Sequence, residues 1–204
     1  MTRVRAICVG RANPLRVGEP DRESFVLSGI VKEAVSTLEN PTPIDLFALG
    51  FAGDEQADLS VHGGHHRAVY AYPLEHYAAW QTMRMQATGR DDCLPWGSLG
   101  ENLTLEGLLE TEIWIGDTLT IGSGRHPPVV LRVSAPRGPC YKLNARLGFK
   151  HAAKMMVQSG YTGFYLEVLQ IGAVCAGDPI SVSAGARAVR LDEQHRLNTR
   201  AAAF

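Results

Sequence analysis

The sequence predicts a mainly β domain, in the form of a barrel with a few helices packed at its sides. Three observations predict this fold class. The apolar segments are short and rich in β-branched residues, 21 glycines and 11 prolines interrupt them often, and helical stretches are few. The 204 residues suit one compact domain, which we place at residues 1–186. Residues 187–204 are polar and contain good helix formers, so we expect a short C-terminal helical tail there.

Nine segments are predicted as strands because they are apolar and are bounded by turn-forming residues. They are residues 4–9, 25–31, 44–49, 68–72, 113–115, 118–121, 129–133, 164–168 and 180–182. Two of these strands follow a Gly-Asp pair and then alternate apolar and polar positions, which is typical of a half-buried strand that leaves a tight turn. This pattern indicates a structural role for Asp117 and Asp178, not a catalytic one.

Three helices are predicted before the C-terminal tail. Residues 73–85 begin with a proline at an acceptable first helical position and carry apolar residues at helical spacing. Residues 141–147 and 149–158 are each followed closely by a glycine, Gly148 and Gly160. Glycine readily adopts the left-handed conformation that ends many helices, so both helices are expected to stop there.

The charge balance and the cysteine spacing exclude some classes of protein. Twenty basic side chains nearly balance 21 acidic ones, which argues against broad nucleic-acid binding. The apolar run before Gly10 is too short for a signal peptide, and no segment is long enough to span a membrane. We therefore expect a cytoplasmic protein with reduced cysteines. The cysteines form no CxxC pair, so each is judged alone; they are Cys8, Cys93, Cys140 and Cys175.

Residues 136–146 carry the strongest chemical signal. Cys140 follows a proline and opens a predicted helix, with Arg137 three residues before it and Lys142 two residues after it. A helix N-terminus and nearby cations both favour the thiolate over the thiol. A thiolate can bind a soft or high-valent metal, and it is also a nucleophile. A buried cysteine without a function is the alternative, and local physics does not decide between the two.

Two further segments, residues 50–68 and 100–107, are rich in glycine and polar residues. The first suggests a metal site through His62, His65 and His66 with Asp54 and Asp58. Glycines between these histidines indicate a loop, in which one histidine bonded to the backbone and two exposed ones are the simpler expectation. The same glycines would let the backbone approach an anion, with Arg67 as a phosphate ligand. In the second segment, Glu101 and Asn102 satisfy buried backbone groups or contact a ligand, and the structural role is favoured for Glu101.

Taken together, these segments resemble the MOSC family, named for the C-terminal domain of molybdenum-cofactor sulfurases, and in particular its small stand-alone YiiM-like subgroup. The elements that carry the resemblance are Gly53-Asp54, Gln56-Ala57-Asp58, His62-Gly63-Gly64, Arg67-Ala68-Val69, Gly100-Glu101-Asn102-Leu103, Ile115-Gly116-Asp117, and Pro136-Arg137 with Pro139-Cys140 and Lys142-Leu143. Their order and spacing match over residues 3–183, which is nearly the whole chain.

The resemblance implies a β-barrel and binding of the molybdenum cofactor, a pterin dithiolene (molybdopterin) that carries a phosphate. By analogy, Cys140 would be the catalytic residue and the protein ligand to molybdenum. The side chains that would contact the cofactor are His62, Arg67, Asn102, Arg137 and Lys142. Guanidinium and ammonium groups suit a phosphate and a pterin.

Similar proteins reduce N-hydroxylated compounds such as hydroxylaminopurines, hydroxylamines and amidoximes. The resemblance therefore implies an oxidoreductase whose partners are a small N-hydroxylated substrate and a separate flavin or iron–sulfur reductase, with a homodimer as one option. Two other hypotheses stay open. One is a cofactor carrier or sulfur-transfer module without its own turnover, and the other is a hydrolase in which a histidine such as His62 activates Cys140.

Two features depart from the family pattern. His66 stands where similar proteins usually carry an acidic residue, so the role of that acid is absent or altered in this chain. YiiM-type proteins also commonly end in a small three-helix unit, whereas this sequence stops soon after one candidate helix. No role of that unit is therefore carried over.

Overall fold

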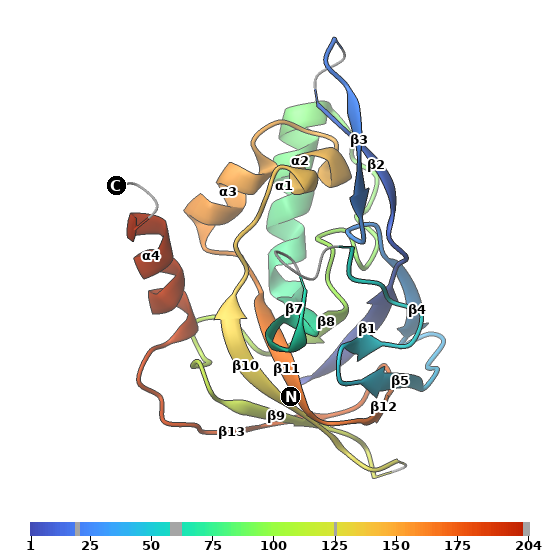
Figure 1. The fold of residues 1–204 in the computed structure, drawn as a ribbon, viewed down its shortest axis with the longest axis vertical. Helices are drawn as coiled ribbons and strands as arrows, with labels where there is room; N and C mark the ends of the chain where they lie inside the picture. Colours follow the sequence, from blue (N-terminus) through green and yellow to red (C-terminus); the bar gives the residue numbers. More distant parts are fainter. Residues whose placement is uncertain (19–20, 58–62, 125, 202–204) are drawn as a thin grey trace.

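The computed structural model describes residues 1–18, 21–57, 63–124 and 126–201, and strands dominate its regular structure (Figure 1). The largest sheet has eight strands: β1 (Arg3–Val9), β4 (Glu33–Thr37), β7 (Val69–Pro73), β8 (Leu103–Glu106), β9 (Thr118–Ile121), β10 (Val129–Pro136), β11 (Phe164–Gln170) and β13 (Ile180–Ser183). Their order in the sheet is β13-β9-β10-β11-β7-β8-β1-β4. Neighbouring strands are antiparallel apart from the parallel pair of β7 and β8.

The eight-stranded sheet curls until its two ends approach each other. The backbone N–H of Val4, in β1, donates to the carbonyl of Asp178 at 3.0 Å, and the N–H of Gly177 donates to the carbonyl of Val4 at 2.8 Å. These bonds join the start of β1 to the turn that precedes β13. The sheet is therefore an incomplete barrel, and the predicted mainly β fold is confirmed.

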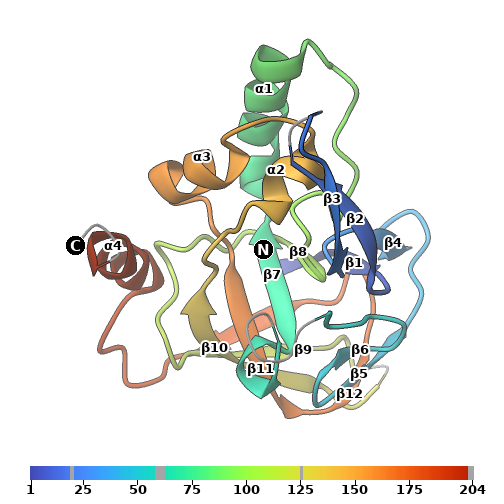
Figure 2. The ribbon, with the colours of Figure 1, turned by 45° about the horizontal axis from the view of Figure 1, so that its top comes forward.

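Two small sheets extend the barrel. One joins β12 (Gly172–Val174), β5 (Ile44–Phe47) and β6 (Gly50–Phe51), and the other is the hairpin of β2 (Asn13–Val17) and β3 (Ser24–Ser28). The hairpin projects beside α2, as Figures 1 and 2 show. This arrangement brings the end of β3 close to the start of α2, where Cys140 lies.

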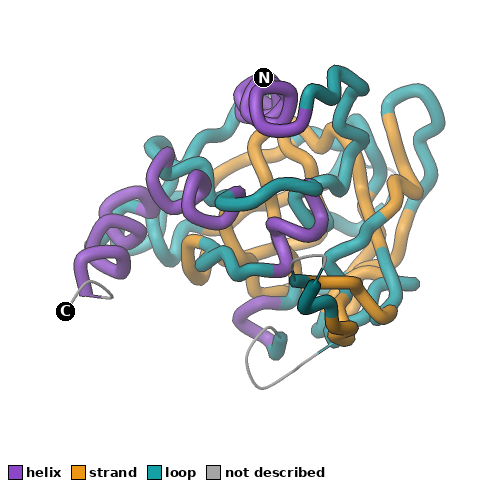
Figure 3. The backbone as a smooth tube through the Cα atoms, turned by 90° about the horizontal axis from the view of Figure 1, so that it is seen from above, coloured by secondary structure: helices purple, strands orange, loops and turns teal. Residues whose placement is uncertain are grey.

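The helices gather at one end of the barrel and at its side. They are α1 (Tyr77–Thr88), α2 (Lys142–Leu147), α3 (Ala152–Ser159) and α4 (Leu191–Ala201), with two short 3-10 helices, η1 (His65–Arg67) and η2 (Leu74–His76). In Figure 3, which looks down on this end, helices lie over and beside the strands, and the chain ends with α4 at the outer side. No helix in the described ranges has the length and apolar character needed to cross a membrane.

Some predicted element boundaries were wrong. Residues 113–115 do not form a strand; Trp114 makes only an isolated bridge to Arg190. Pro73 does not open a helix, because it is the last residue of β7 and a 3-10 turn follows it before α1 begins at Tyr77. Both errors have the same cause, since local pattern does not reveal which distant segment a short run will pair with.

The predicted turn roles of the two aspartates are confirmed. The carboxylate of Asp117 is fully buried and accepts from the backbone N–H groups of Gly185 at 2.8 Å and Trp114 at 3.2 Å. The carboxylate of Asp178 accepts from the N–H of Cys175 at 2.8 Å. Asp178 therefore closes its own turn, and Asp117 closes its turn and also joins it to Gly185, so both side chains have the structural role predicted for them.

Strand β7 separates two groups of buried side chains, because successive residues of a strand point to opposite faces. Val69 and Ala71 face the barrel core, which includes Val4, Ile7, Leu103, Leu105, Ile113, Leu119, Ile121, Leu131 and Phe164. Tyr70 and Tyr72 face the aromatic cluster, which also includes Ile30, Tyr77, Trp80, Leu99, Leu143, Leu147, Phe149, Ala152 and Met156. The aromatic cluster fixes α1, α2 and α3 to the barrel, and the candidate site borders it.

Candidate functional site

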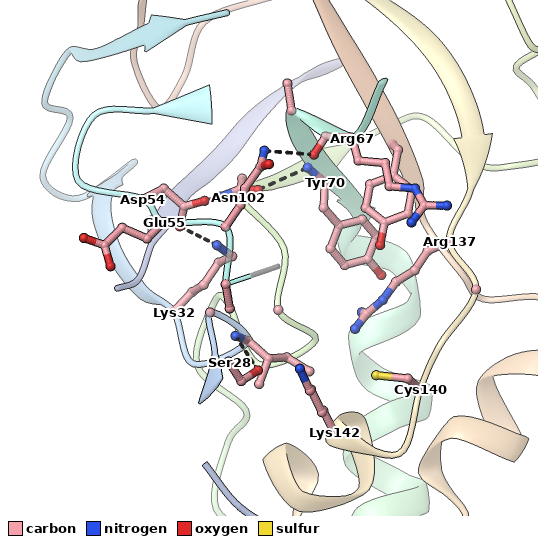
Figure 4. A pocket seen from close by; sticks show the side chains of 18 residues that line it. Ser28, Lys32, Asp54, Glu55, Arg67, Tyr70, Asn102, Arg137, Cys140 and Lys142 are labelled. Atoms are coloured by element: carbon pink, nitrogen blue, oxygen red, sulfur yellow. Dashed lines mark hydrogen bonds and ion pairs between the residues drawn. The ribbon is translucent and has the colours of Figure 1, made fainter. Parts of the chain in front are cut away.

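A pocket opens between the end of the hairpin, the loop after β10 and the segment around η1 (Figure 4). It contains about 730 Å³ of space, part of which is open solvent. The residues that line it are Ser28, Gly29, Ile30, Lys32, Asp54, Glu55, Gln56, Ala57, Arg67, Ala68, Tyr70, Gly100, Asn102, Arg137, Gly138, Cys140, Lys142 and Tyr165. Five residues predicted from the sequence thus meet in one place: Arg67, Asn102, Arg137, Cys140 and Lys142.

Cys140 lies in the short loop between β10 and α2 and is half-buried. Its carbonyl accepts from the N–H of Leu143, which starts the first turn of α2. Figure 4 shows its sulfur directed into the pocket, between Arg137 and Lys142. This thiol can therefore be reached by a ligand, which removes the alternative of a cysteine packed in the apolar interior.

The other cysteines differ from Cys140 in their surroundings. Cys8 is fully buried in β1, and burial raises the pKa of its thiol far above the ordinary range. Cys93 is exposed and Cys175 is half-buried, and neither lines the pocket. Of the four thiols, Cys140 is the one placed to bind a ligand from this pocket.

Three cationic side chains from different segments line the pocket together with Cys140. The guanidinium of Arg137 is buried, lies 4.5 Å from the ring centre of Tyr70 and donates a hydrogen bond to the carbonyl of Leu99. The guanidinium of Arg67 lies 5.6 Å from the ring centre of Tyr165. The amine of Lys142 donates to the carbonyl of Leu27 at 3.1 Å. Cations that converge on one concave surface attract anionic ligands.

A buried ion pair forms the opposite wall of the pocket. The amine of Lys32 contacts the carboxylate of Asp54, and both side chains are more than nine-tenths buried. The carboxylate of Asp54 also accepts from the N–H of Gly10 at 2.9 Å and from the side-chain amide of Asn102 at 2.8 Å. Asp54 is therefore held from three directions. Lys32 was missed from the sequence, since a lysine at the start of a polar stretch is normally a solvated charge.

Asn102 ties this wall to the barrel. Its amide oxygen accepts from the backbone N–H of Tyr70 at 3.1 Å, and its amide nitrogen donates to the carbonyl of Cys8 at 3.2 Å as well as to Asp54. The side chain lines the pocket, yet its hydrogen-bonding groups already have protein partners. The geometry assigns Asn102 to holding the wall in place, and its contact with a cofactor stays a prediction.

Glu101 has the structural role that its sequence context favoured. It is fully buried, and its carboxylate accepts from the backbone N–H groups of Gly97 at 2.9 Å and Leu99 at 3.0 Å. The hydroxyl of Tyr77 also donates to it. These bonds fix the loop that contains Leu99, whose carbonyl accepts the hydrogen bond from Arg137. A buried glutamate thus positions the pocket without reaching it.

The histidine segment contributes less than its sequence suggested. His62 and Asp58 lie outside the described residues. His65 and His66 are exposed on η1 and do not line the pocket; the ring of His66 lies 3.5 Å from the carboxylate of Glu167. Within the described part of the chain, no three His, Cys, Asp or Glu side chains come close enough to hold a metal ion. Among the described residues that line the pocket, Cys140 is the soft donor that a metal ion would use.

The fold and the site together define a class of protein: an incomplete β-barrel with one accessible thiol in a cation-lined pocket. The comparisons with known proteins agree. The sequence model of the MOSC domain matches residues 58–181. The protein YflK of Bacillus subtilis is 33% identical over 189 residues, which are 90% of this chain and 78% of that protein. This chain therefore belongs to the MOSC domain family.

Two further relatives refine this assignment. A protein of Gibberella moniliformis described as a reductase is 36% identical over 156 residues, which are 76% of this chain but only 26% of that protein. In that relative, the matching domain is thus part of a much longer chain. The crystal structure of YiiM from Geobacillus stearothermophilus superposes with a TM-score of 0.68 at 27% identity, covering 97% of this chain and 84% of that chain. The resemblance to the YiiM-like subgroup is confirmed.

Proposed function

We propose that this protein is an oxidoreductase that binds the molybdenum cofactor and reduces small N-hydroxylated compounds. One observation carries the proposal: the Cys140 thiol is directed into a pocket lined by Arg67, Arg137 and Lys142. Membership of the MOSC family and the relative described as a reductase support it. Hydroxylaminopurines, hydroxylamines and amidoximes are the substrate classes to test first.

The residues of the pocket fit the cofactor chemically. A thiolate is a soft donor that suits a molybdenum centre, so Cys140 would bind the metal. The cofactor also carries a phosphate, which the guanidinium groups of Arg67 and Arg137 and the ammonium group of Lys142 would bind. His62 would add a further contact, which stays a prediction because it lies outside the described residues.

When bound, the molybdenum centre supplies two electrons to the N–O bond of the substrate, and a separate flavin or iron–sulfur reductase restores them. The chain itself would do three things. Cys140 would fix the position of the metal, and the cations would orient the anionic part of the cofactor. The buried side chains beneath them would keep this arrangement rigid. A cytoplasmic location and a homodimer also stay predictions.

The experiment compares wild type, Cys140→Ser and, as a matched control, Cys93→Ser, all made in cells that synthesise the cofactor. We expect stoichiometric molybdenum in wild type and in Cys93→Ser. In Cys140→Ser, we expect both molybdenum content and reduction of a hydroxylaminopurine by an artificial electron donor to fall by more than about 100-fold, because the ligand to the metal is lost. Elemental analysis and product chromatography provide the measurements.

The other outcomes separate the competing functions. Molybdenum that depends on Cys140, without turnover of any N-hydroxylated compound, would identify a carrier or sulfur-transfer module. Hydrolytic activity in protein without molybdenum would favour a cysteine hydrolase. Loss of activity in Cys93→Ser, with Cys140→Ser unaffected, would show that Cys140 is the wrong thiol.

A further inference from the structure

The Lys32–Asp54 ion pair lies in the pocket wall, where a buried ion pair is weak evidence for added stability. Among the described residues that line the pocket, these two form a salt bridge in which both side chains are nearly inaccessible, with 7% and 6% of their surface exposed. Removing two charges from water costs several kcal/mol per ion, which their mutual attraction often fails to recover. Buried ionisable groups in a pocket are candidates for catalysis for this reason.

The two members of the pair are held very differently. The carboxylate of Asp54 accepts from Gly10, Asn102 and Lys32, so it is fixed as an acceptor. The ammonium group of Lys32 has three N–H donors, and within the described ranges one of them has Asp54 as its partner. Figure 4 shows this amine on the wall opposite Arg137 and Cys140, across the opening of the pocket. Lys32 can therefore donate to a ligand bound between the two walls.

We propose that Lys32 is the proton donor for N–O bond cleavage and that Asp54 is the positioning residue that holds its amine. This inference rests on the proposed function. The overall step is R–NH–OH + 2 e⁻ + 2 H⁺ → R–NH₂ + H₂O. The reduced cofactor would supply the two electrons that break the N–O bond. Lys32 would give its proton to the departing hydroxyl, which leaves as water. The nitrogen takes the second proton from solvent, and solvent reprotonates the amine beside Asp54.

The other polar groups of the pocket are less suited to this step. The guanidinium groups of Arg67 and Arg137 do not release protons in proteins. The hydroxyl of Tyr70 donates to the carbonyl of Thr162 at 2.7 Å, and burial raises its pKa, so its proton is held. The amine of Lys142 is directed to the backbone of the hairpin. Of the cationic groups that line the pocket, Lys32 thus combines a fixed position with a donor toward the ligand.

The first test uses Lys32→Ala and Lys32→Arg in the cofactor-loaded protein, with the exposed Lys154→Ala on α3 as a matched control. Loss of a positioned acid typically lowers kcat by about 10²- to 10⁴-fold. We expect such a loss in both Lys32 variants, with molybdenum content unchanged. Arginine preserves the charge and the contact with Asp54 but does not donate its proton. Recovery of kcat in Lys32→Arg would therefore overturn the proposal and indicate a purely electrostatic role.

Chemical rescue gives the second test. We expect methylammonium to restore turnover in Lys32→Ala, and the rescued rate to vary with the acidity of a series of small amines. A structural role would give no such dependence. In cofactor-free Lys32→Ala, methylammonium should also raise the melting temperature by occupying the space beside Asp54, and Asp54→Asn added to this variant should abolish the shift. Absence of rescue and of the shift would contradict the assignment.

These outcomes separate this inference from the function on which it rests. Wild-type holoprotein that fails to reduce any N-hydroxylated compound would refute the proposed function and the proton donor with it. Active wild type together with a fully active Lys32→Ala would refute the proton donor alone. If Lys32→Ala does not fold, Lys32→Arg carries the same test, because it keeps the buried charge paired.

Discussion

The barrel core and the aromatic cluster lie on opposite faces of β7 and differ in chemistry. The barrel core is almost entirely aliphatic, and its residues carry no hydrogen-bonding groups on their side chains. The aromatic cluster contains Tyr70, Tyr72, Tyr77 and Trp80, each of which has a polar atom bonded to a defined partner. Aliphatic packing tolerates exchange of similar volumes, whereas a bonded aromatic side chain has one acceptable orientation.

This difference explains where the pocket lies. Tyr70 belongs to the aromatic cluster, and its ring also supports Arg137 at the pocket wall. The backbone N–H of the same residue donates to Asn102, which holds Asp54. The candidate site thus lies on the face of β7 where the aromatic side chains have fixed orientations. The barrel core, on the other face, provides stability. Three substitutions test this difference between the two regions.

The largest effect on stability is expected from Leu131→Ala in the barrel core. Leu131 is fully buried in β10, and truncation leaves a cavity that the surrounding strands fill only partly. We expect the free energy of unfolding to fall by about 2–5 kcal/mol. Urea denaturation measures this loss, with the exposed Leu197→Ala on α4 as a control that should stay within about 0.5 kcal/mol of wild type. Molybdenum content per folded protein should not change, and a change would contradict the division between the two regions.

A smaller effect is expected from Tyr72→Phe in the aromatic cluster. The hydroxyl of Tyr72 donates to the carbonyl of Tyr161 at 2.8 Å and accepts from the indole N–H of Trp80, which is fully buried. Removal leaves that N–H without an acceptor, so we expect a loss of about 1–3 kcal/mol in the free energy of unfolding. The exposed Tyr141→Phe serves as control. Unlike Leu131→Ala, Tyr72→Phe should also lower molybdenum retention, and normal retention would weaken the comparison.

The smallest effect is expected at the surface, where Asp92 binds Arg84 of α1. Hydrogen bonds from Arg84 and Arg90 lower the pKa of the Asp92 carboxyl to about 2. Because this pKa is lower in the folded state, the ionised carboxylate stabilises the protein at pH values above the ordinary pKa of an aspartate. This contribution disappears as the pH falls toward 2. Asp92→Asn should therefore reduce the urea midpoint slightly at pH 7, and the difference from wild type should narrow between pH 4 and pH 2. A difference that grows on acidification would refute this account; Asp91→Asn is the matched control.

Features that depend on nearby residues were predicted correctly from the sequence more often than features that depend on distant segments. Gly148 and Gly160 end α2 and α3 in the left-handed conformation, with φ of 76° and 75°, because a helix terminus depends on the residue at that point. Strands β2, β4, β6, β8 and β12 were missed. In β2, Pro14 reads as an interruption, although a proline is acceptable at the edge of a two-stranded hairpin. In β8, three residues pair in parallel with β7, which no local signal reveals.

The mainly β fold class, the two aspartate turns and the grouping of Cys140 with Arg137 and Lys142 could be predicted from the amino-acid sequence, because each has a signal within a few residues. The folded chain was needed to show which face of β7 carries the polar network and that Lys32 is buried against Asp54, 22 residues further along the chain. Burial and the pairing of charges depend on how the whole chain excludes water. Local spacing contains no information about that.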